Sequence, residues 1–149
     1  MSTGEKSEVL LSVKNLVKQF PVKGGFFGRE IAAVKAVQNV SFDIYKGETL
    51  GLVGESGCGK STLGRTILRL IEPTSGEIFF KGQDITKIGS NELRKLRRNM
   101  QIIFQDPYAS LNPRMTIEEI LGEPLEIHKL ANSKEERLKR IYELFDLVG

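Results

Sequence analysis

TLGLVGESGCGKST, at residues 49–62, is the stretch that decides the fold of this 149-residue chain. It joins a short apolar run, residues 49–53, to a glycine-rich loop and then to residues with helical periodicity. The loop matches G-x-x-x-x-G-K-[ST], which binds phosphate when it lies between a strand and a helix. The matching positions are Gly54, Gly59, Lys60 and Ser61. We therefore predict an α/β fold, a strand at 49–53 buried on both faces, and a bound nucleoside triphosphate.

Each part of this loop has a physical role in gripping phosphate. Glycine has no Cβ, so the backbone can wrap around an anion with its N–H groups pointing inward. The helix that follows adds unpaired N–H groups and the positive end of its dipole. Lys60 is expected to reach the β- and γ-phosphates, Ser61 to ligate Mg²⁺, and Thr62 to cap the helix or contact the α-phosphate. The predicted nucleotide-binding residues here are Gly54, Glu55, Ser56, Gly57, Cys58, Gly59, Lys60, Ser61 and Thr62.

Length and composition agree with one soluble intracellular domain, or part of one. The chain is 40% hydrophobic and 28% charged, with a net charge of only +3, which is ordinary globular usage. No apolar run reaches the length of a membrane span, and residues 1–8, which we expect to be disordered, lack a secretory pattern. Cys58 is the only cysteine, which excludes an internal disulfide and a cysteine-ligated zinc site within one chain. His128 is the only histidine, without a second ligand at metal spacing.

The first half of the chain has strand patterns around the loop. Residues 9–13, 37–44 and 77–81 are expected to be strands, and residues 22–30 an exposed hairpin loop or flap. After the loop, apolar residues from Leu63 to Ile71 predict a helix.

The second half is more helical. Ser90 is expected to cap a helix at 91–99, and two capping boxes predict helices after Thr116 and Ser133, with Glu119 and Glu136 as their acidic partners. The helix at 91–99 is rich in basic residues, which raises a nucleic-acid interpretation. Because no aromatic residues are interleaved with these charges, a solvated helix face is favoured.

Residues 100–107, MQIIFQDP, form an apolar strand pattern that runs into polar residues. Metal-side chemistry in α/β nucleotide sites lies at such strand ends. Asp106 could be a Walker-B-type acid that holds Mg²⁺, or the Gln105 amide could face the metal or its water. Alternatively, Asp106 and Pro107 form a turn that stops the strand. The residues alone leave these alternatives open.

The loop at 54–62, GQDI at 82–85 and QIIFQDP at 101–107, followed by SLNPR at 110–114, together resemble the ATP-binding subunits of ABC transporters. The resemblance covers nearly the whole chain from Val9. More narrowly, FPVKGGFF at 20–27 and GETLGLVGESGCGK at 47–60 resemble the oligopeptide and dipeptide importer branch, in its second ATPase subunit.

The resemblance implies a role for three regions. The loop is the Walker A motif, and Gln105 is the Q-loop glutamine, which in the family touches the Mg²⁺ site and lies beside the contact with the membrane subunits. Gln105 is thereby favoured over Asp106. Phe20 falls where the family places an aromatic that stacks on adenine; the alternative is a core or strand-end aromatic. The implied cofactors are ATP and Mg²⁺.

The implied fold is a truncated P-loop NTPase core, with an antiparallel β subdomain and Walker A core at about 9–105 and the start of a helical subdomain at about 106–149. The implied partners are membrane permease subunits, a second ATP-binding subunit, identical or homologous, and indirectly a substrate-binding protein, with no nucleic acid. The implied location is the cytoplasmic face of the cell membrane, as a peripheral protein.

The family's signature motif, its Walker B strand with the catalytic glutamate and its switch histidine would lie beyond Gly149. We therefore expect an N-terminal fragment that binds Mg-nucleotide without turning it over. Strands that normally cover 49–53 and 100–104 would also be missing, which is an aggregation or swapping hazard.

Three alternatives to the ABC interpretation remain. A P-loop GTPase would need N-K-x-D, which is absent, although residues 146–149 fit D-x-x-G at the end of a predicted helix. A small-molecule kinase would need an arginine-rich lid, which the acidic helices after Thr116 do not resemble. A non-catalytic fragment that only assembles with membrane partners is the third.

Overall fold

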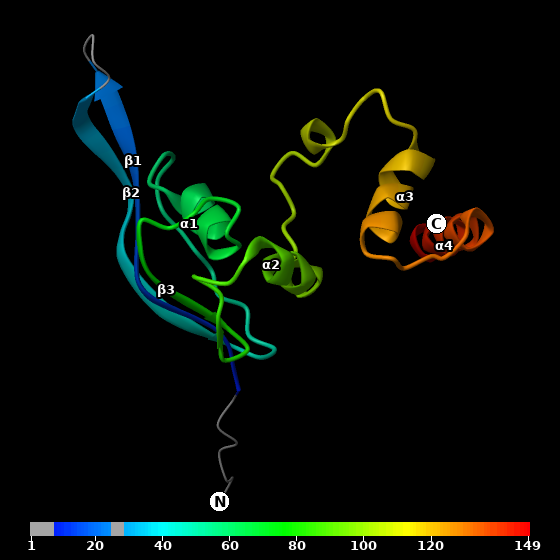
Figure 1. Ribbon diagram of the computed structural model, residues 1–149, viewed down its shortest axis with the longest axis horizontal. Coiled ribbons are helices and arrows are strands. Elements are labelled where there is room, and N and C mark those ends of the chain that lie inside the picture. Colours follow the sequence, from blue (N-terminus) through cyan, green and yellow to red (C-terminus); the bar gives the residue numbers. More distant parts are fainter. Residues whose placement is uncertain (1–7, 25–28) are drawn as a thin grey trace, which may run out of the picture. The chain divides into compact units, whose positions relative to one another are not determined.

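The computed structural model describes residues 8–24 and 29–149. These residues form two compact units, which divide between Gln101 and Ile102. The first unit contains a sheet with the helices α1 and α2, and the second contains α3 and α4 (Figure 1). Of the N-terminal residues expected to be disordered, 1–7 lie outside the described part. The carbonyl of Glu8 accepts a hydrogen bond from the backbone N–H of Lys46 at 2.9 Å.

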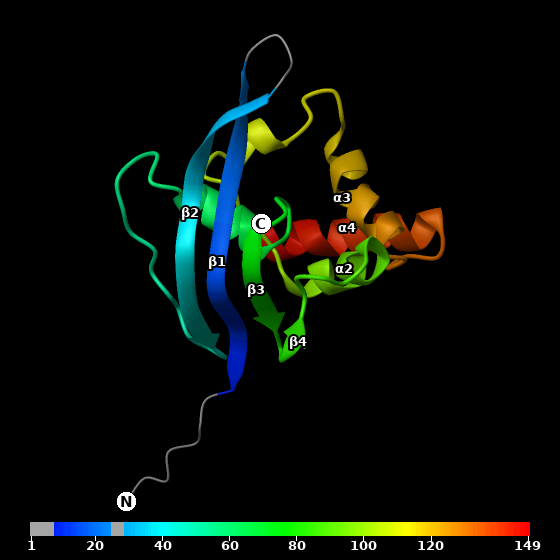
Figure 2. The same ribbon diagram turned by 60° about the vertical axis from the view of Figure 1, so that its left-hand side comes forward.

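The sheet is built around one long antiparallel hairpin. Strand β1 (Val9–Gly24) pairs along its length with β2 (Arg29–Tyr45) and, on its other side, with β3 (Ser75–Phe80). The short β4 (Gln83–Asp84) pairs with β3, giving the order β2-β1-β3-β4 shown in Figure 2. The antiparallel β subdomain predicted from the sequence is therefore confirmed. The tip of the predicted hairpin loop, residues 25–28, lies outside the described residues.

One face of this sheet packs against α1 (Lys60–Ile67) and buries the main core. Helix α1 contacts both β1 and β2, and Figure 1 shows it on the same side of the sheet as α2. Thr66, fully buried in α1, donates its hydroxyl to the Thr62 carbonyl at 2.7 Å, so its polar atom is satisfied. The buried hydrophobic cluster consists of Val13, Leu16, Val37, Leu63, Ile78, Phe80 and Ile85.

Helix α1 is shorter than the sequence pattern predicts, because the chain turns at Arg69. Arg69 has a positive φ of 49°, and its guanidinium donates to the carbonyls of Ile85 and Ile88 at 2.9 Å each. The same group binds the Glu72 carboxylate, and the Arg69 carbonyl accepts from Arg97 at 2.9 Å. One half-buried arginine thus ties the end of α1 to the segment that leads into α2.

The α2 region differs slightly from its prediction. Helix α2 (Ser90–Leu96) starts one residue earlier than expected, with Gly89 and not Ser90 as its N-cap, and it continues as the 3-10 turn η1 (Arg97–Asn99). Leu93 is buried and Leu96 packs against the main core, which holds α2 on the sheet unit.

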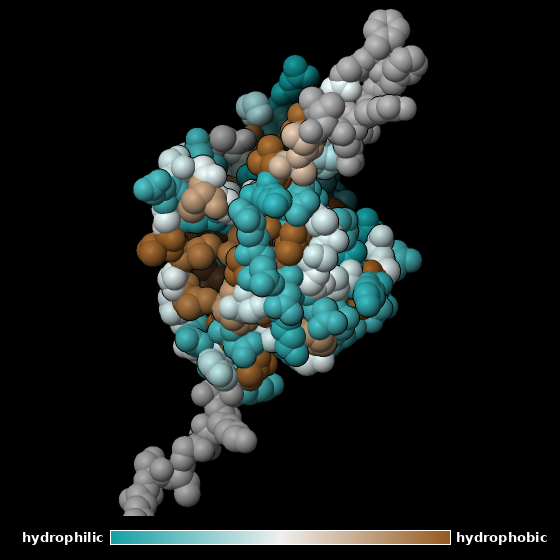
Figure 3. Space-filling model, turned by 90° about the vertical axis from the view of Figure 1, so that its left-hand side faces the viewer, coloured by the Kyte–Doolittle hydropathy of each residue, from teal (hydrophilic) through white to brown (hydrophobic). Residues whose placement is uncertain are grey.

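The two apolar segments predicted as strands, at 49–53 and 100–104, are not strands in this structure. Residues 49–53 and 100–104 have no assigned strand structure, and Val53 and Ile103 are 90% and 91% exposed. A buried parallel strand requires hydrogen-bonded neighbours. Among the described strands, none pairs with either segment. On the face that Figure 3 shows, hydrophobic side chains, in brown, are exposed at the surface, most of them near one edge of the view.

The second unit contains the 3-10 turn η2 (Tyr108–Ser110), α3 (Ile117–Ile127) and α4 (Lys134–Val148). The capping box of Thr116 and Glu119 is complete, as predicted. At α4 the Ser133 hydroxyl accepts from the backbone of Glu136, but the Glu136 carboxylate accepts from Asn132 and not from Ser133.

Helices α3 and α4 pack around Arg137. Its guanidinium pairs with Glu126 and lies 3.8 Å from the Glu118 carboxylate. Its aliphatic stem runs over buried Gly122, where an added Cβ would lie 3.2 Å from the Arg137 Cδ atom. Within the described residues, no helix has both the length and the apolar character that crossing a membrane requires.

Replacing Arg69 should weaken the first unit. Arg69→Met keeps the length of the side chain but leaves the Ile85 and Ile88 carbonyls without their charged donor, so we expect a loss of about 2 kcal/mol in unfolding free energy. Urea denaturation measures it. Arg65→Met, an exposed arginine in the last turn of the same helix, is the control and should cost less than about 0.5 kcal/mol. Equal losses in the two variants would contradict this role.

Asp84 should make stability depend on pH in the acid range. The pKa of its carboxyl is lowered, first by the hydrogen bond from the backbone N–H of Thr86 at 2.8 Å. Because the folded pKa lies below the unfolded value of 3.8, the stabilisation is complete above that value and disappears as pH falls through the folded pKa. Urea midpoints measured from pH 6 to pH 2.5 should fall less steeply in Asp84→Asn than in wild type. Asp43→Asn controls for the loss of an exposed charge, and identical acid profiles in wild type and Asp84→Asn would refute the assignment.

Candidate phosphate-binding site

Two of the three glycines in the loop at 54–59 have a positive φ, and Gly54 does not. Gly57 and Gly59 have φ values of 81° and 101°, in the left-handed region that side chains other than glycine rarely adopt. The backbone N–H of Cys58 donates to the Glu55 carbonyl at 3.3 Å, which closes the loop before α1 begins.

Gly59 is required for a second reason, which is its contact with β2. A Cβ at Gly59 would lie 2.1 Å from the carbonyl oxygen of Ala36, far inside van der Waals contact. The loop therefore rests with its backbone directly on the backbone of β2. The sequence contains no signal for Ala36, because this residue contacts the loop through its backbone carbonyl and belongs to no recognisable motif.

Lys60 points its ammonium into the arch of the loop. Its Nζ atom donates to the carbonyls of Gly54 and Glu55 at 2.6 Å each and lies 3.6 Å from the Cys58 sulfur. A lysine ammonium has three donors and no acceptor, so these contacts place a positive charge where the loop curves. At this position the ammonium could bind the oxygens of a phosphate group enclosed by the loop.

The first turn of α1 keeps its donors available. Within the part of the chain that the structure describes, no side chain caps this turn, and the turn contains no acidic residue. Its N–H groups and the positive end of the helix dipole therefore suit an anion. Ser61 is exposed beside them, and Thr62 is half-buried with its carbonyl engaged by Thr66.

A pocket of about 310 Å³ opens beside the loop. Loop residues Cys58, Gly59 and Lys60 form one wall, β2 forms another, and Leu52 and Val53 contribute apolar surface. The combination of a cationic group, backbone donors and apolar walls is typical of a small-molecule site.

Phe20 lies on β1 opposite Val34, and it is 38% exposed. The ammonium of Lys18 lies 4.9 Å from the centre of its ring. The Phe20 side chain is therefore partly exposed and does not belong to the buried core.

Gln105 is exposed and belongs to the second unit, as does Asp106, whereas Ser61 belongs to the first. The approach of Gln105 to Ser61 and to a shared Mg²⁺ stays a prediction.

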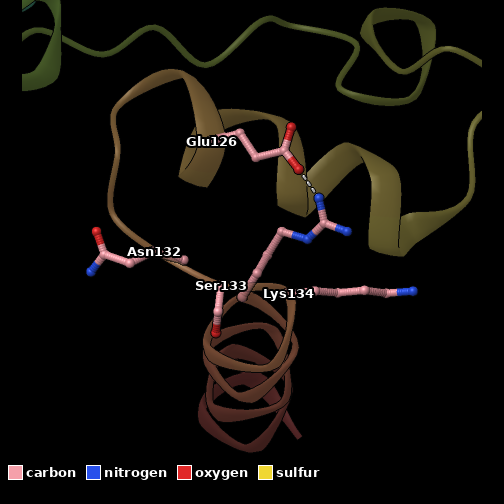
Figure 4. Close-up of a pocket in the computed structure, with 6 residues that line it drawn as sticks. Glu126, Asn132, Ser133 and Lys134 are labelled. Atoms are coloured by element: carbon pink, nitrogen blue, oxygen red, sulfur yellow. Dashed lines mark hydrogen bonds and ion pairs between the residues drawn. The ribbon is translucent and has the colours of Figure 1, made fainter.

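A second hollow, of about 330 Å³, lies between the end of α3 and the start of α4. Figure 4 shows Glu126 turned toward the start of α4, while Lys134 points away from Glu126. The Arg137 guanidinium pairs with Glu126 and Glu118, and Ser133 caps α4, whereas the buried Arg137 Nε atom has no hydrogen-bond partner among the described residues. We therefore interpret this hollow as part of the packing between α3 and α4 and not as a ligand site.

The residues of this site suit Mg²⁺ that is bound mainly through the phosphate oxygens of a nucleotide. In residues 8–24 and 29–149, no three His, Cys, Asp or Glu side chains gather closely enough to hold an ion. The glycine cradle, the Lys60 ammonium and the Ser61 hydroxyl suit a Mg-phosphate group, in which the phosphate oxygens supply most of the metal's ligands.

The family model of ABC transporters matches residues 37–149, which include the loop and α1. The chain belongs to the ABC transporter family. Its predicted class, a P-loop core with an antiparallel β subdomain, is confirmed.

Curated relatives of this ABC transporter chain include two oligopeptide transport ATP-binding proteins of Bacillus subtilis (strain 168). AppF is 50% identical over 148 residues, covering 99% of this chain and 45% of AppF. OppF is 54% identical over 144 residues, covering 96% of this chain and 45% of OppF. The glutathione import ATP-binding protein GsiA of Salmonella paratyphi A is 50% identical over 144 residues, which are 23% of its length. The chain thus spans less than half the length of these relatives.

Among solved structures, this ABC chain is similar to the ATP-binding cassette MJ0796, a dimer in a post-hydrolysis state bound to ADP and Pi. The TM-score is 0.70 at 34% sequence identity, covering 89% of this chain and 54% of the cassette.

Gly59→Ala should abolish the phosphate site of this ABC chain. The added methyl would meet the Ala36 carbonyl and demand an unfavourable φ, so the loop must leave β2. We expect Mg-ATP affinity, measured by isothermal titration calorimetry, to fall at least about 100-fold, equivalent to about 2.7 kcal/mol. Gly64→Ala is the matched control, because it lies in α1 with open space around it and should keep the wild-type affinity. Wild-type binding by Gly59→Ala would disprove the loop geometry.

Proposed function

We propose that these residues belong to the ATP-binding subunit of an ABC-type peptide importer, and that the 149-residue chain binds Mg-ATP. The observation that carries the proposal is the arch at 54–62, in which Lys60 points into a loop held on β2 by Gly59. The peptide substrate class is supported by the names of AppF and OppF, which are oligopeptide transport proteins.

In the proposed complex, the backbone N–H groups of the loop and the first turn of α1 bind the phosphate oxygens. Lys60 would exchange its carbonyl partners for the β- and γ-phosphates, as a point charge. Ser61 and Gln105 are the residues proposed to hold Mg²⁺, which when bound neutralises charge on the triphosphate. Phe20 is proposed to stack on the adenine, with an interaction of about 1–3 kcal/mol.

Turnover is proposed to require more than this chain. Hydrolysis needs an acid to orient water and a second surface facing the nucleotide, and in the proposed assembly a second ATP-binding subunit supplies that surface. The dimeric state of MJ0796 supports this arrangement. The proposed further partners are permease subunits and, indirectly, a substrate-binding protein. The proposed location is peripheral, on the cytoplasmic face of the membrane.

Mg-ATP should stabilise the chain. At a concentration one hundred times its Kd, it should add about 2.7 kcal/mol to the unfolding free energy, measured as a thermal shift. Lys60→Ala should lose this shift, while Lys95→Ala, which removes an exposed lysine on α2, should keep it. A parallel titration with Mg-GTP tests the GTPase alternative, which requires GTP to bind more tightly than ATP.

The same protein should hydrolyse no appreciable ATP. A steady-state rate that Lys60→Ala abolishes would overturn the proposed dependence on a partner. If Mg-ATP causes no thermal shift, the proposal that the chain binds Mg-ATP is wrong. If the chain then still co-purifies with permease subunits, the non-catalytic alternative, in which it only assembles with membrane partners, is favoured.

A further inference from the structure

Lys18 and Phe20 lie two residues apart on β1, so their side chains lie on the same face of the sheet. The Lys18 ammonium is 4.9 Å from the centre of the Phe20 ring, which is within the range of a cation–π interaction. It is also tethered, because Nζ donates to the carbonyl of Glu72 at 2.8 Å. The cation over this ring is therefore held from two sides.

The tether connects β1 to the turn that follows the phosphate-loop helix. Next to the Lys18 bond, the backbone N–H of Gln19 donates to the Thr74 hydroxyl at 2.9 Å, and the N–H of Thr74 donates to the Val17 carbonyl at 2.8 Å. These three bonds fix the strand just before Phe20 against the chain that leaves α1.

We propose that Lys18 is a positioning residue for the nucleotide base, acting through Phe20. This inference rests on the proposed nucleotide function. Because the ammonium lies over one ring face, the base would stack on the opposite face. The charge also draws ring electrons toward itself, which makes the opposite face less negative and a better partner for an electron-rich purine.

If Lys18 acts through Phe20, it contributes to binding of the base and not to binding of the phosphates. Lys18→Met removes the charge and the tether at nearly equal side-chain length. We expect it to weaken Mg-ATP binding about two- to fivefold, the range of an exposed cation–π contact. Affinity for Mg-tripolyphosphate, which has no base, should be unchanged. Lys18→Arg, which keeps the charge and the donors, should restore ATP affinity.

Two controls match this variant. Lys14 lies 4.7 Å from the ring centre of Phe79, the same contact on the same strand but without a proposed role in binding, so Lys14→Met should leave ATP affinity unchanged. In a Phe20→Ala background, which should itself weaken ATP binding, Lys18→Met should have no further effect, because the two residues act as one unit. Lys18→Gln, an uncharged donor, replaces Lys18→Met if that variant fails to fold.

Calorimetric titrations of these variants decide the inference. Equal losses for ATP and tripolyphosphate would overturn it, since Lys18 would then act only as a distant charge or through the fold. No loss for ATP in Lys18→Met, or none in Phe20→Ala, would overturn it as well. If wild type binds neither ligand, the proposed nucleotide function fails instead, so the two failures are distinguishable.

Discussion

The contact between the backbone of Gly59 and the carbonyl of Ala36 is the constraint on which the site depends. It leaves no room for a side chain, and so it sets the loop directly on β2. From that position α1 runs across the sheet and places Leu63 in the main core. The same start of α1 leaves Lys60 inside the arch of the loop. This one close approach between two segments of the backbone therefore orients α1, the Lys60 ammonium and the N–H donors of the first helical turn together.

The groups proposed to bind the phosphates are backbone N–H groups and the Lys60 ammonium, with the Ser61 hydroxyl beside them. Such groups bind anions well but transfer no protons, which fits a chain whose proposed role is to hold a nucleotide rather than to cleave it alone. The two exposed apolar segments, at 49–53 and 100–104, also indicate surfaces that favour a partner. Val53 and Ile103 face solvent with side chains suited to a protein interior, so these surfaces would gain free energy from being covered.

Sequence reasoning succeeded where the information lies within a few residues. The left-handed glycine that precedes α1 and the capping box of Thr116 and Glu119 are each specified by local spacing, and both are present. It failed at residues 49–53, because whether an apolar run becomes a strand depends on partners elsewhere in the chain. It was silent on Ala36, whose contribution is a carbonyl. The role of Gln105 depends on how two units approach one another, which no local pattern encodes.

Cys58 has a practical consequence for anyone who wishes to attach a probe to this protein. It is the only sulfhydryl in the sequence, it is exposed, and its sulfur would lie 2.7 Å from a methyl placed on Gly54. Any maleimide dye or spin label will therefore be attached within the glycine-rich loop at 54–59 and will crowd the neighbouring Gly54. A spectroscopist who wants an unperturbed reporter must first move the thiol to another surface, such as the exposed side of α4.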